Sequence, residues 1–347
     1  MKLGFICQPD TANAYYRVVY PMEEMERRGH RVIWPGNHDY DAILAGRPDW
    51  DLMHVHQCFG AEDVELVTRF REAGMAIVWD SDDDVLSVPK GTESYRKYGR
   101  RRGLRRMFEQ TLEMARACHL MTTTNEHLAQ IYRDNGVEHV AVIGNYLSRA
   151  VMRPKRRVHQ GVVVGMMAAN EHGTDIDRLG IARALRRVQQ AHQDVSVVAL
   201  GVDLGLRERY VHRPKVPFQQ INSYLSAFDI ALAPLLDSPF NRSRSNVKLK
   251  EYANAGAVWL ASPVGPYADM GAEHGGLLVG DDEWFDAIDG LVSDARRRSE
   301  LAARGRRWAS TQSIRAAGPT WEAAFRDAVI RAKREAGRLD RAVASRR

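Results

Sequence analysis

The chain has 347 residues, which is more than one hydrophobic core usually covers, so two domains are expected. Hydrophobic residues make up 44% of it and charged residues 27%, which is the composition of an ordinary soluble globular protein. The net charge of +6 is mild, and no apolar run reaches the length of about eighteen residues that a membrane-spanning helix needs.

The beginning of the chain, MKLGFICQPD, has too short an apolar part for a signal peptide and is typical of a first strand. The cysteines Cys7, Cys58 and Cys118 lie far apart without a CxxC pair. This spacing favours reduced core residues over a metal or disulfide role, and it predicts a cytoplasmic protein.

Short runs rich in Val and Ile alternate with helical patterns along the whole chain, which is typical of parallel sheets with crossover helices. In the first half, strands are expected at 2–7, 31–34, 52–56, 76–80, 120–124 and 140–145, and helices at 15–29 and 105–118. A polar linker follows at 148–160. In the second half, strands are expected at 162–167, 195–201, 230–235, 258–262 and 276–280, and helices at 177–192, 221–228, 248–256 and 318–336.

This pattern predicts two consecutive doubly wound α/β domains, at 1–150 and 151–318, followed by a C-terminal helix with a basic tail at 319–347. Trp321 and Phe325, four residues apart, predict a buried stripe on that helix. Ligands of such folds bind beyond the carboxyl ends of the strands. We therefore expect the functional site in a cleft between the domains.

The stretch SRSNVKLKEYANAG, residues 243–256, predicts a helix whose N-cap is Ser245 or Asn246. Arg242, Arg244 and Lys248 crowd its beginning, where the helix dipole makes each cation unfavourable by a few tenths to about 1 kcal/mol unless an anion lies among them. Free N–H groups, the dipole and these cations together form a phosphate site.

Lys248 and Glu251 are three residues apart and share one face of this helix. A lysine that reaches a diphosphate and a carboxylate that accepts hydrogen bonds from two sugar hydroxyls would suit a nucleotide sugar. The spacing fits a surface Lys–Glu pair on an ordinary helix equally well, so it does not decide between the two interpretations.

VPFQQINSYLSAFDIALAPL followed by SNVKLKEYANAGAVWLASPVGPY resembles the C-terminal half of GT-B fold glycosyltransferases, the group typified by family-four-like retaining enzymes. YYRVVYPMEEMERRGHRV, DLMHVHQ, VAVIGNYL and TWEAAFRDAV resemble further segments of the same group, so the resemblance covers nearly the whole chain. It implies two Rossmann-like domains with a C-terminal helix that packs back on the first. It also implies a nucleotide-sugar donor in the second domain and an acceptor in the first, with metal-independent transfer, retention of configuration and no cofactor.

Three departures from that group stand out. QPDTANAYY occupies the place of the glycine-rich loop, Ser243 stands where the first Glu of a Glu-x7-Glu pattern would fall, and GMMAANEHGTD replaces the usual phosphate clamp. Lys248, with Arg242 or Arg244, is therefore expected to carry more of the diphosphate. By resemblance, Glu251 binds the ribose hydroxyls, and the donor pocket includes Asn170 and His172.

VWDSDDD, residues 78–84, places several carboxylates at the end of a strand. We assign Asp80 and Asp82 to catalysis and Asp83, with Tyr16 and Arg17 of the first helix, to the acceptor side. Two alternatives are a site for Mg²⁺ or Mn²⁺, as in the Asp-x-Asp motif of GT-A enzymes, and a solvated acidic turn.

His54 and His56 occur on the strand at 52–56, and we expect them on opposite faces of the sheet. His54 is then a core histidine. His56, nearer to the strand end, joins the catalytic set.

The basic run RKYGRRRGLRR, residues 96–106, is a solvated helix entry or a contact for an anionic acceptor, in which case Arg102 and Arg105 lie on the acceptor side. A lipid-linked glycan at a membrane surface and a modified base in DNA both qualify electrostatically.

The sequence thus predicts a glycosyltransferase that uses a nucleoside diphosphate sugar. A metal-dependent transferase built on Asp80–Asp84 is one alternative, and a non-catalytic sugar- or nucleic-acid-binding scaffold is another. A dehydrogenase is disfavoured because neither half carries G-x-G-x-x-G after its first strand.

Overall fold

The computed structural model describes residues 1–7, 11–33, 50–97, 100–152, 154–155 and 157–344, with side chains up to residue 337 except those of 93 and 94. The chain forms two compact units. Unit 1 comprises Met1–Leu86, Arg101–Asn145 and Ile314–Arg347, and unit 2 comprises Ser87–Arg100 and Tyr146–Ser313. Residues 8–10, 34, 98–99, 153, 156 and 345–347, which fall within segments interpreted above, lie outside the described residues.

The units differ from the ranges expected from the sequence in three places, the smallest of which is that residues 146–150, expected in the first domain, belong to unit 2. Residues 87–100, expected in the first domain, belong to unit 2, where their short helix contacts the turn at Asn170–His172. The last helix begins at Ile314 and belongs to unit 1, so it is not a separate segment.

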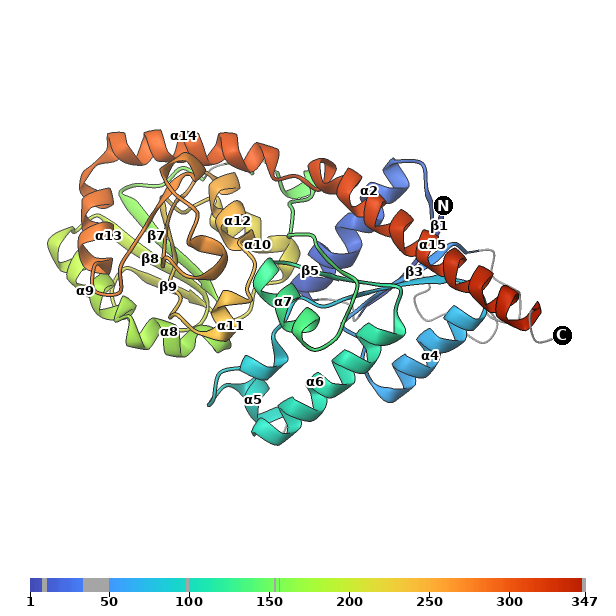
Figure 1. The fold of residues 1–347 in the computed structure, drawn as a ribbon. Coiled ribbons are helices and arrows are strands. Elements are labelled where there is room, and N and C mark those ends of the chain that lie inside the picture. The colour runs from blue at the N-terminus through green and yellow to red at the C-terminus, as the bar shows by residue number, and fades with distance from the viewer. Residues whose placement is uncertain (8–10, 34–49, 98–99, 153, 156, 345–347) are drawn as a thin grey trace. The chain divides into compact units, whose positions relative to one another are not determined.

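Unit 1 is built on a parallel sheet of six strands in the order β2-β1-β3-β4-β5-β6 (Figure 1). Every residue of β3 and β4 is buried, as expected for strands covered by helices on both faces. The strands are β1 Lys2–Ile6, β2 Arg31–Ile33, β3 Leu52–His56, β4 Ala76–Asp80, β5 Leu120–Thr123 and β6 Val140–Val142. The helices are α1 Ala12–Ala14, η1 Tyr15–Val19, α2 Tyr20–Arg27, α4 Ala61–Glu72, α6 Arg100–Ala117, α7 Glu126–Asp134 and α15 Ile314–Ala344, with η2 at Val85–Ser87.

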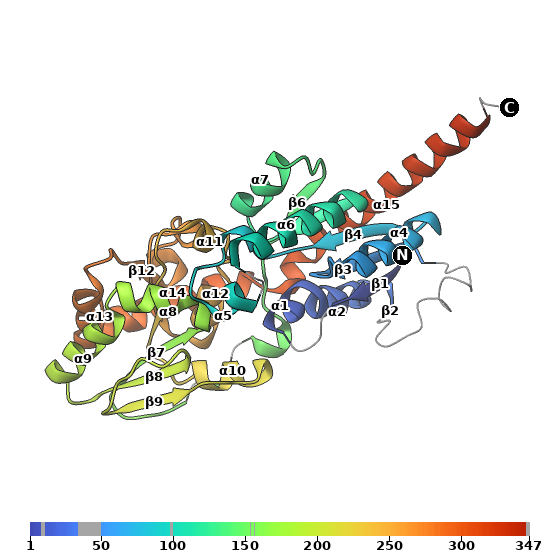
Figure 2. The same ribbon diagram turned by 90° about the horizontal axis from the view of Figure 1, so that it is seen from below.

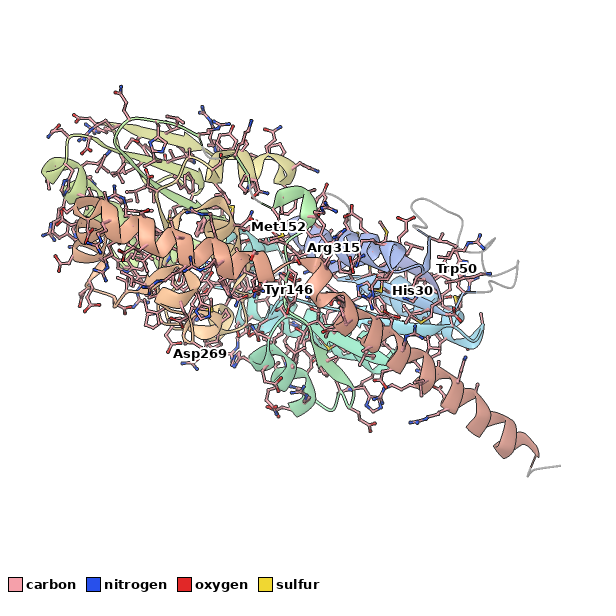
Figure 3. The ribbon with its side chains drawn as sticks, turned by 90° about the horizontal axis from the view of Figure 1, so that it is seen from above. His30, Trp50, Tyr146, Met152, Asp269 and Arg315 are labelled. Atoms are coloured by element: carbon pink, nitrogen blue, oxygen red, sulfur yellow. The ribbon has the colours of Figure 1, made fainter. Side chains whose placement is uncertain are left out.

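The long helix α15 lies along α2 and extends past the sheet (Figures 1 and 2). Trp321 and Phe325 are fully buried, which confirms the predicted stripe, and the Phe325 ring meets Phe5 of β1 edge-on at 6.0 Å between centroids. Beside this stripe, an oxygen of the Glu322 carboxylate lies 3.3 Å from Nε2 of His30, which is labelled in Figure 3. Apolar and polar contacts together fix α15 to unit 1.

Unit 2 has a second parallel sheet of six strands in the order β12-β11-β10-β7-β8-β9. The strands are β7 Val162–Ala168, β8 Val195–Gly201, β9 Tyr210–Arg213, β10 Ile230–Ala233, β11 Val258–Ala261 and β12 Gly276–Leu278. The α-helices are α5 Glu93–Lys97, α8 Gly173–Arg178, α9 Ile181–Ala191, α10 Phe218–Leu225, α11 Pro239–Arg242, α12 Val247–Ala255, α13 Trp284–Ser293 and α14 Ala295–Thr311. Short 3-10 turns are η3 Arg149–Val151, η4 Asn170–His172, η5 Gly265–Tyr267 and η6 Ala272–His274. Two doubly wound α/β units are therefore confirmed.

Several local features differ from the prediction, and the helices α4, α7, α13 and α14 were not among the predicted ranges. The single helix expected at 177–192 is broken at Gly180, whose φ of 64° is left-handed, so that α8 ends and α9 begins there. Strand β9 was not predicted. The first helix contains the π-helical stretch η1, a widened turn of a kind found often at functional sites.

Within the described part of the chain, no helix combines the length and the apolar character needed to cross a membrane. The cysteines are free and half-buried, and burial raises the pKa of the Cys7 thiol to about 11 and that of Cys58 to about 12.

Candidate functional site

Unit 2 gathers polar side chains where the neighbouring parallel strands β7 and β10 end. The carboxyl ends of these strands share one edge of the sheet, and β7 leads into η4 and α8 while β10 leads into α11 and α12. The Tyr252 hydroxyl of α12 accepts a hydrogen bond from the Met167 N–H at 2.9 Å and donates one to the Leu232 carbonyl at 3.2 Å. This buried hydroxyl therefore ties α12 to both strands.

Asp175 is the centre of a buried network at this edge. One carboxylate oxygen lies 3.0 Å from Nδ1 of His172, and the other accepts from the Asn241 amide at 3.1 Å and from the Leu236 N–H at 3.3 Å. All three side chains of the network are at least nine-tenths buried. Because Asp175 follows β7 and Asn241 follows β10, the network holds the two loops together.

Burial and the neighbouring Lys248 ammonium lower the pKa of the His172 ring, which favours its neutral form. Since the carboxylate of Asp175 faces Nδ1, this nitrogen carries the proton, and Nε2, 3.5 Å from the Arg244 guanidinium, is left as an acceptor.

Lys248 lies beside His172, and three charged side chains shift the pKa of its ammonium group. Burial and the Arg244 guanidinium lower the pKa of the Lys248 ammonium to about 8, while Glu251 and Asp175 act in the opposite direction. Glu251 is buried, with 5% of its surface exposed. The Lys248–Glu251 pair is therefore part of a cluster at the sheet edge and not a surface pair.

The helix α12 begins at Val247, and its N-cap residue Asn246 makes no side-chain capping bond. No acidic residue occurs in the first turn. Ser245 and Asn246 are half-buried beside this helix start. Dipole, Lys248 and Arg244 thus place positive charge at one point, which suits an anion.

Not every residue predicted for the donor joins this cluster. The Arg242 side chain is about half exposed and holds both oxygens of Asp237, at 2.6 and 2.7 Å. Arg242 is thus already paired with an exposed carboxylate, which argues against its assignment to the diphosphate, whereas Arg244 lies 3.5 Å from Nε2 of His172. Asp175 and Asn241 were missed, although the spacing of three between His172 and Asp175 was a visible signal.

Asn170 lines a cavity of about 510 Å³ at the ends of β7 and β8. Glu171, Lys215 and Ile221 contribute to its wall, as does Lys97 from α5 in the first half of the chain. The assignment of residues 87–100 to unit 2 thus places Lys97 where no sequence pattern predicted it.

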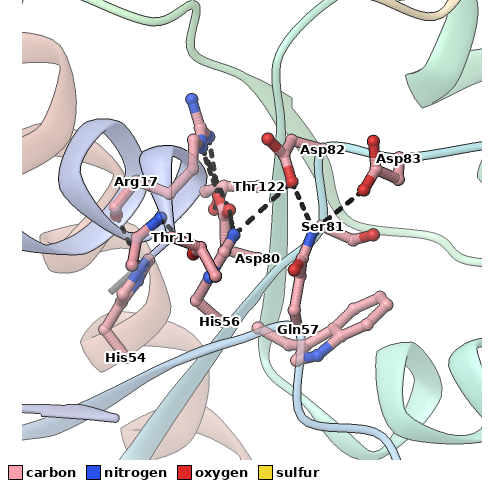
Figure 4. A network of polar contacts seen from close by, with 12 residues as sticks. Thr11, Arg17, His54, His56, Gln57, Asp80, Ser81, Asp82, Asp83 and Thr122 are labelled. Atoms are coloured by element: carbon pink, nitrogen blue, oxygen red, sulfur yellow. Dashed lines mark hydrogen bonds and ion pairs between the residues drawn. The ribbon is translucent and has the colours of Figure 1, made fainter. Parts of the chain in front are cut away.

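Unit 1 has a second polar cluster at the carboxyl end of its own sheet (Figure 4). The strand register puts His56, Asp80 and Thr122 in one row across β3, β4 and β5. The Thr122 hydroxyl donates to an oxygen of Asp80 at 2.5 Å.

Asp80 forms a buried ion pair with Arg17 of η1. The Arg17 Nη2 donates to Asp80 at 2.6 Å and Nε at 3.0 Å, while Nη1 donates to the Ile143 carbonyl and, at 3.1 Å, to Asn145. The guanidinium also lies 5.0 Å from the centroid of the Trp321 ring. Burial alone would raise the pKa of Asp80, but Arg17 holds it below the usual value.

This ion pair corrects two sequence-based roles. Arg17 and Asp80 are both 0% exposed, and each satisfies the other. Arg17 and Asp80 together hold the first helix to the sheet, which argues against the acceptor-side role expected of Arg17 and the catalytic role expected of Asp80. Tyr16 is also buried, edge-on to Tyr20 at 5.7 Å between ring centroids, which removes it from the acceptor side.

His54 and His56 do not lie on opposite faces. Residues two apart in a strand point to the same face, so the prediction was wrong. Nε2 of His54 bonds the Arg17 carbonyl at 3.1 Å, and burial lowers its pKa to about 4. Nε2 of His56 lies 3.7 Å from Asp80 and 3.5 Å from Asp82. His54 is a core residue, as expected, while His56 faces the carboxylates.

Asp82 and Asp83 are held by Gln57, which follows β3. The Gln57 amide donates to Asp82 at 2.7 Å and to Asp83 at 3.2 Å. The φ of Gln57 is 54°, a left-handed conformation that is uncommon outside glycine and that concentrates at functional sites. The backbone at this strand end is thus held in a strained form that aims the amide at the two carboxylates.

Arg102 and Arg105 lie exposed on α6, where the Arg105 guanidinium is 3.5 Å from Glu109. Among the residues described, no group of at least three His, Cys, Asp or Glu side chains is arranged to hold a metal ion.

No family model matches the chain and no curated protein matches its sequence, but many solved structures share its fold. Anabaena HepE in complex with UDP and glucose is 14% identical, with a TM-score of 0.62 over 92% of this chain and 98% of HepE. Sucrose-phosphate synthase from Thermosynechococcus elongatus is 14% identical, with a TM-score of 0.61 over 100% of both chains.

A mutant of S. aureus TarM, in complex with fondaparinux, alpha-GlcNAc-glycerol and UDP, is 13% identical with a TM-score of 0.58. That match covers 79% of this chain and 55% of TarM. Together with the two parallel sheets, these likenesses show that the chain has the GT-B fold.

Proposed function

We propose that the chain is a glycosyltransferase that moves a sugar from a nucleoside diphosphate sugar, bound by unit 2, to an acceptor bound by unit 1. The observation that carries this proposal is the cluster at the start of α12. There Lys248 and Arg244 lie beside the buried Glu251 and a neutral His172. The fold that the chain shares with HepE, a protein solved with UDP and glucose, supports the same assignment.

Different groups of this cluster bind different parts of the donor, according to their charge. The diphosphate is held by the start of α12, near Ser245 and Asn246, with Lys248 and Arg244 as counter-charges. Glu251 accepts hydrogen bonds from the ribose hydroxyls. The nucleoside extends towards the cavity lined by Asn170, whose polar and apolar wall suits a base.

In the reaction, a hydroxyl oxygen of the acceptor bonds to the anomeric carbon, and the bond from that carbon to the diphosphate breaks. The electron pair leaves with the diphosphate, where Lys248 and Arg244 stabilise the added charge without a metal. The hydroxyl proton goes to Asp82, which Gln57 holds beside His56. Retention of configuration remains part of this proposal through the family resemblance.

A metal-dependent transferase built on Asp80–Asp84 is the rival. Asp80 is the weakest part of that alternative, because its oxygens already accept hydrogen bonds from Arg17 and Thr122. A non-catalytic scaffold is the second rival, since it would bind nucleotide without turnover.

The test is release of the nucleoside diphosphate from UDP-, GDP-, ADP- and dTDP-sugars, with and without EDTA. Slow hydrolysis stands in for transfer while the acceptor is unidentified. Wild type is compared with Lys248→Met and Glu251→Gln, which keep side-chain size. Arg242→Ala is the matched control, because that arginine is paired with Asp237.

EDTA-resistant release from one donor, lost in both site variants and kept in the control, is the expected result. Release that requires Mn²⁺ and persists in both variants would instead support a metal-dependent transferase that uses the carboxylates of unit 1. Nucleotide binding without release, measured by calorimetry in the presence of saccharide acceptors, would favour the non-catalytic scaffold.

A further inference from the structure

A cavity of about 460 Å³ lies at the amino end of the unit 1 sheet, opposite the strand end that carries Asp80. Its wall includes His119, which directly precedes β5, and His139, which directly precedes β6. Four arginines from α4, α6 and α15 also line it: Arg71, Arg116, Arg331 and Arg334. Because all of these residues belong to unit 1, the cavity is formed within one unit of the fold. Its volume is in the range of small-molecule sites, about 300–1,000 Å³.

Two of these arginines are neutralised by carboxylates. Nη2 and Nε of Arg71 donate to one oxygen of Glu335 at 2.6 and 3.1 Å, and Nε of Arg331 donates to Asp327 at 2.8 Å. The other oxygen of Glu335 lies 3.3 Å from Nε2 of His119. Burial and the Arg71 guanidinium lower the pKa of His119, which favours the neutral ring. Glu335 is therefore occupied by Arg71 and His119.

The other two arginines, Arg116 and Arg334, have no carboxylate partner among the described side chains. Arg116 donates to the Asn135 carbonyl at 2.6 Å, at the end of α7, and Arg334 makes no hydrogen bond or ion pair within the described part of the chain. Both side chains are exposed, so a ligand in solution can reach them. Two guanidiniums at one cavity repel each other unless an anion lies between them.

A phosphate monoester matches this pair of guanidiniums. It carries a charge of about −1.5 to −2 at pH 7 and three terminal oxygens, so both arginines can donate to it. Guanidinium–phosphate contacts are frequently bidentate and stronger than hydrogen bonds between neutral groups. A phosphodiester carries only one negative charge and a carboxylate likewise, so neither neutralises both guanidiniums.

The rest of the cavity wall indicates what the phosphate is attached to. The cavity is larger than a phosphate group alone would fill. Glu138 and His139 contribute polar groups, and Ala115 and Val137 contribute apolar surface. A carbon chain that carries hydroxyls suits such a mixed wall, because its hydroxyls can donate to the Glu138 carboxylate.

We propose that the cavity at the amino end of the unit 1 sheet binds a small phosphate monoester with a hydroxylated carbon chain, such as a sugar phosphate, through Arg116 and Arg334. This site is separate from the donor cluster of unit 2, so the inference goes beyond the proposed function and does not depend on it. Since Arg116 belongs to α6 and Arg334 to α15, the bound phosphate links the last helix to the body of unit 1.

The experiment is calorimetric titration of the full chain with glucose 6-phosphate and glycerol 3-phosphate. Inorganic phosphate, glucose and glycerol are the comparison probes. At least one monoester is expected to bind more tightly than inorganic phosphate, and the two neutral compounds are not expected to bind. Lys248→Met should leave this binding unchanged, which distinguishes the cavity from the diphosphate site of unit 2.

Arg116→Gln and Arg334→Gln should each weaken the monoester about fivefold or more, because each removes a charge-assisted contact. Arg334→Lys keeps the charge without the planar fork and should weaken it less than Arg334→Gln. Lys333→Gln is the matched control. It removes the same charge from the next exposed residue of α15, which does not line the cavity, and should weaken the monoester by about twofold at most.

A lipid headgroup offers the same chemistry, so flotation with phosphatidylcholine vesicles, with and without phosphatidic acid, is the second arm. Binding to the phosphatidic acid vesicles without binding of either soluble monoester would overturn the inference in favour of a membrane. It is also overturned if neither monoester binds more tightly than inorganic phosphate, if Arg334→Gln behaves like Lys333→Gln, or if Lys248→Met abolishes the binding.

Discussion

The two units carry the same kind of parallel sheet but opposite charges at its carboxyl end. In unit 1 the cation, Arg17, is buried and paired with Asp80, and the carboxylates of Asp82 and Asp83 follow at the same strand end. In unit 2 the carboxylate, Asp175, is the buried partner, and Lys248 and Arg244 stand at the edge. The ion that is used for structure thus determines which charges are left beside each strand end: carboxylates in unit 1 and, in unit 2, the cations to which we assign the diphosphate.

The largest expected effect comes from breaking the structural ion pair of unit 1. Asp80→Asn leaves the Arg17 guanidinium buried without its counter-charge, which typically costs about 3–5 kcal/mol of the free energy of unfolding. Urea unfolding of the variant beside wild type measures the loss. Asp237→Asn, which breaks the exposed pair with Arg242, is the control and should cause no measurable loss. If both variants lost the same free energy of unfolding, the buried ion pair would be no more important for stability than the exposed one.

The next effect is on the diphosphate site of unit 2. Lys248→Met should lower the affinity for UDP about tenfold to a hundredfold, because one hydrogen bond to a charged group is worth about 1.5–3 kcal/mol. The affinity for UMP, which lacks the second phosphate, should fall less. Lys250→Met is the matched control, since Lys250 lies on the same helix with its ammonium 4.2 Å from the centroid of the Tyr146 ring. Calorimetric titration with UDP and UMP separates these cases, and equal losses from both substitutions would contradict the assignment.

The same lysine predicts a pH dependence of binding. Burial and Arg244 lower the pKa of Lys248 to about 8, so the ammonium that attracts a diphosphate is lost as the pH rises through that value. UDP affinity should therefore fall above pH 8 in wild type and in Lys250→Met, and should be flat in Lys248→Met. Burial also lowers the pKa of Lys250 to about 8, so persistence of the decline in Lys250→Met tests which lysine is responsible.

Stability should respond to pH in the opposite direction. Both lysines have an ordinary pKa of 10.5 when unfolded, so between pH 8 and 10.5 the unfolded chain binds more protons than the folded chain. The free energy of unfolding should then rise with pH across that window while UDP affinity falls. A parallel decline of both quantities would mean that loss of fold, and not loss of one charge, weakens binding.

The sequence predicted the strands well because each is a short apolar run in a sheet covered on both faces. The exception is β9, Tyr210–Arg213, which lies at the sheet edge and alternates half-buried with exposed residues, so it has no such run. The break at Gly180 was also missed, because helical periodicity continues on both sides of it and only the φ of 64° reveals the interruption.

The site was predictable only where its residues are neighbours in sequence. Lys248 and Glu251 share a helix face through their spacing, and a local pattern suffices for that. The pairing of Arg17 with Asp80, 63 residues away, and of Asp175 with Asn241, 66 away, depends on which strands adjoin. These long-range pairs determine which charged side chains are neutralised inside the protein. The opposite charges at the two strand ends were therefore not predictable from composition.

The smallest effect is expected from the exposed arginines of α6, which take part in neither strand-end cluster. Arg102→Ala with Arg105→Ala should change the free energy of unfolding by no more than about 0.5 kcal/mol per substitution, as is usual for surface positions. UDP affinity should change less than twofold, while any weak oligonucleotide binding should fall with its salt dependence. A larger loss of stability or of UDP affinity would show that the arginines of α6 make contacts beyond the exposed pair of Arg105 with Glu109.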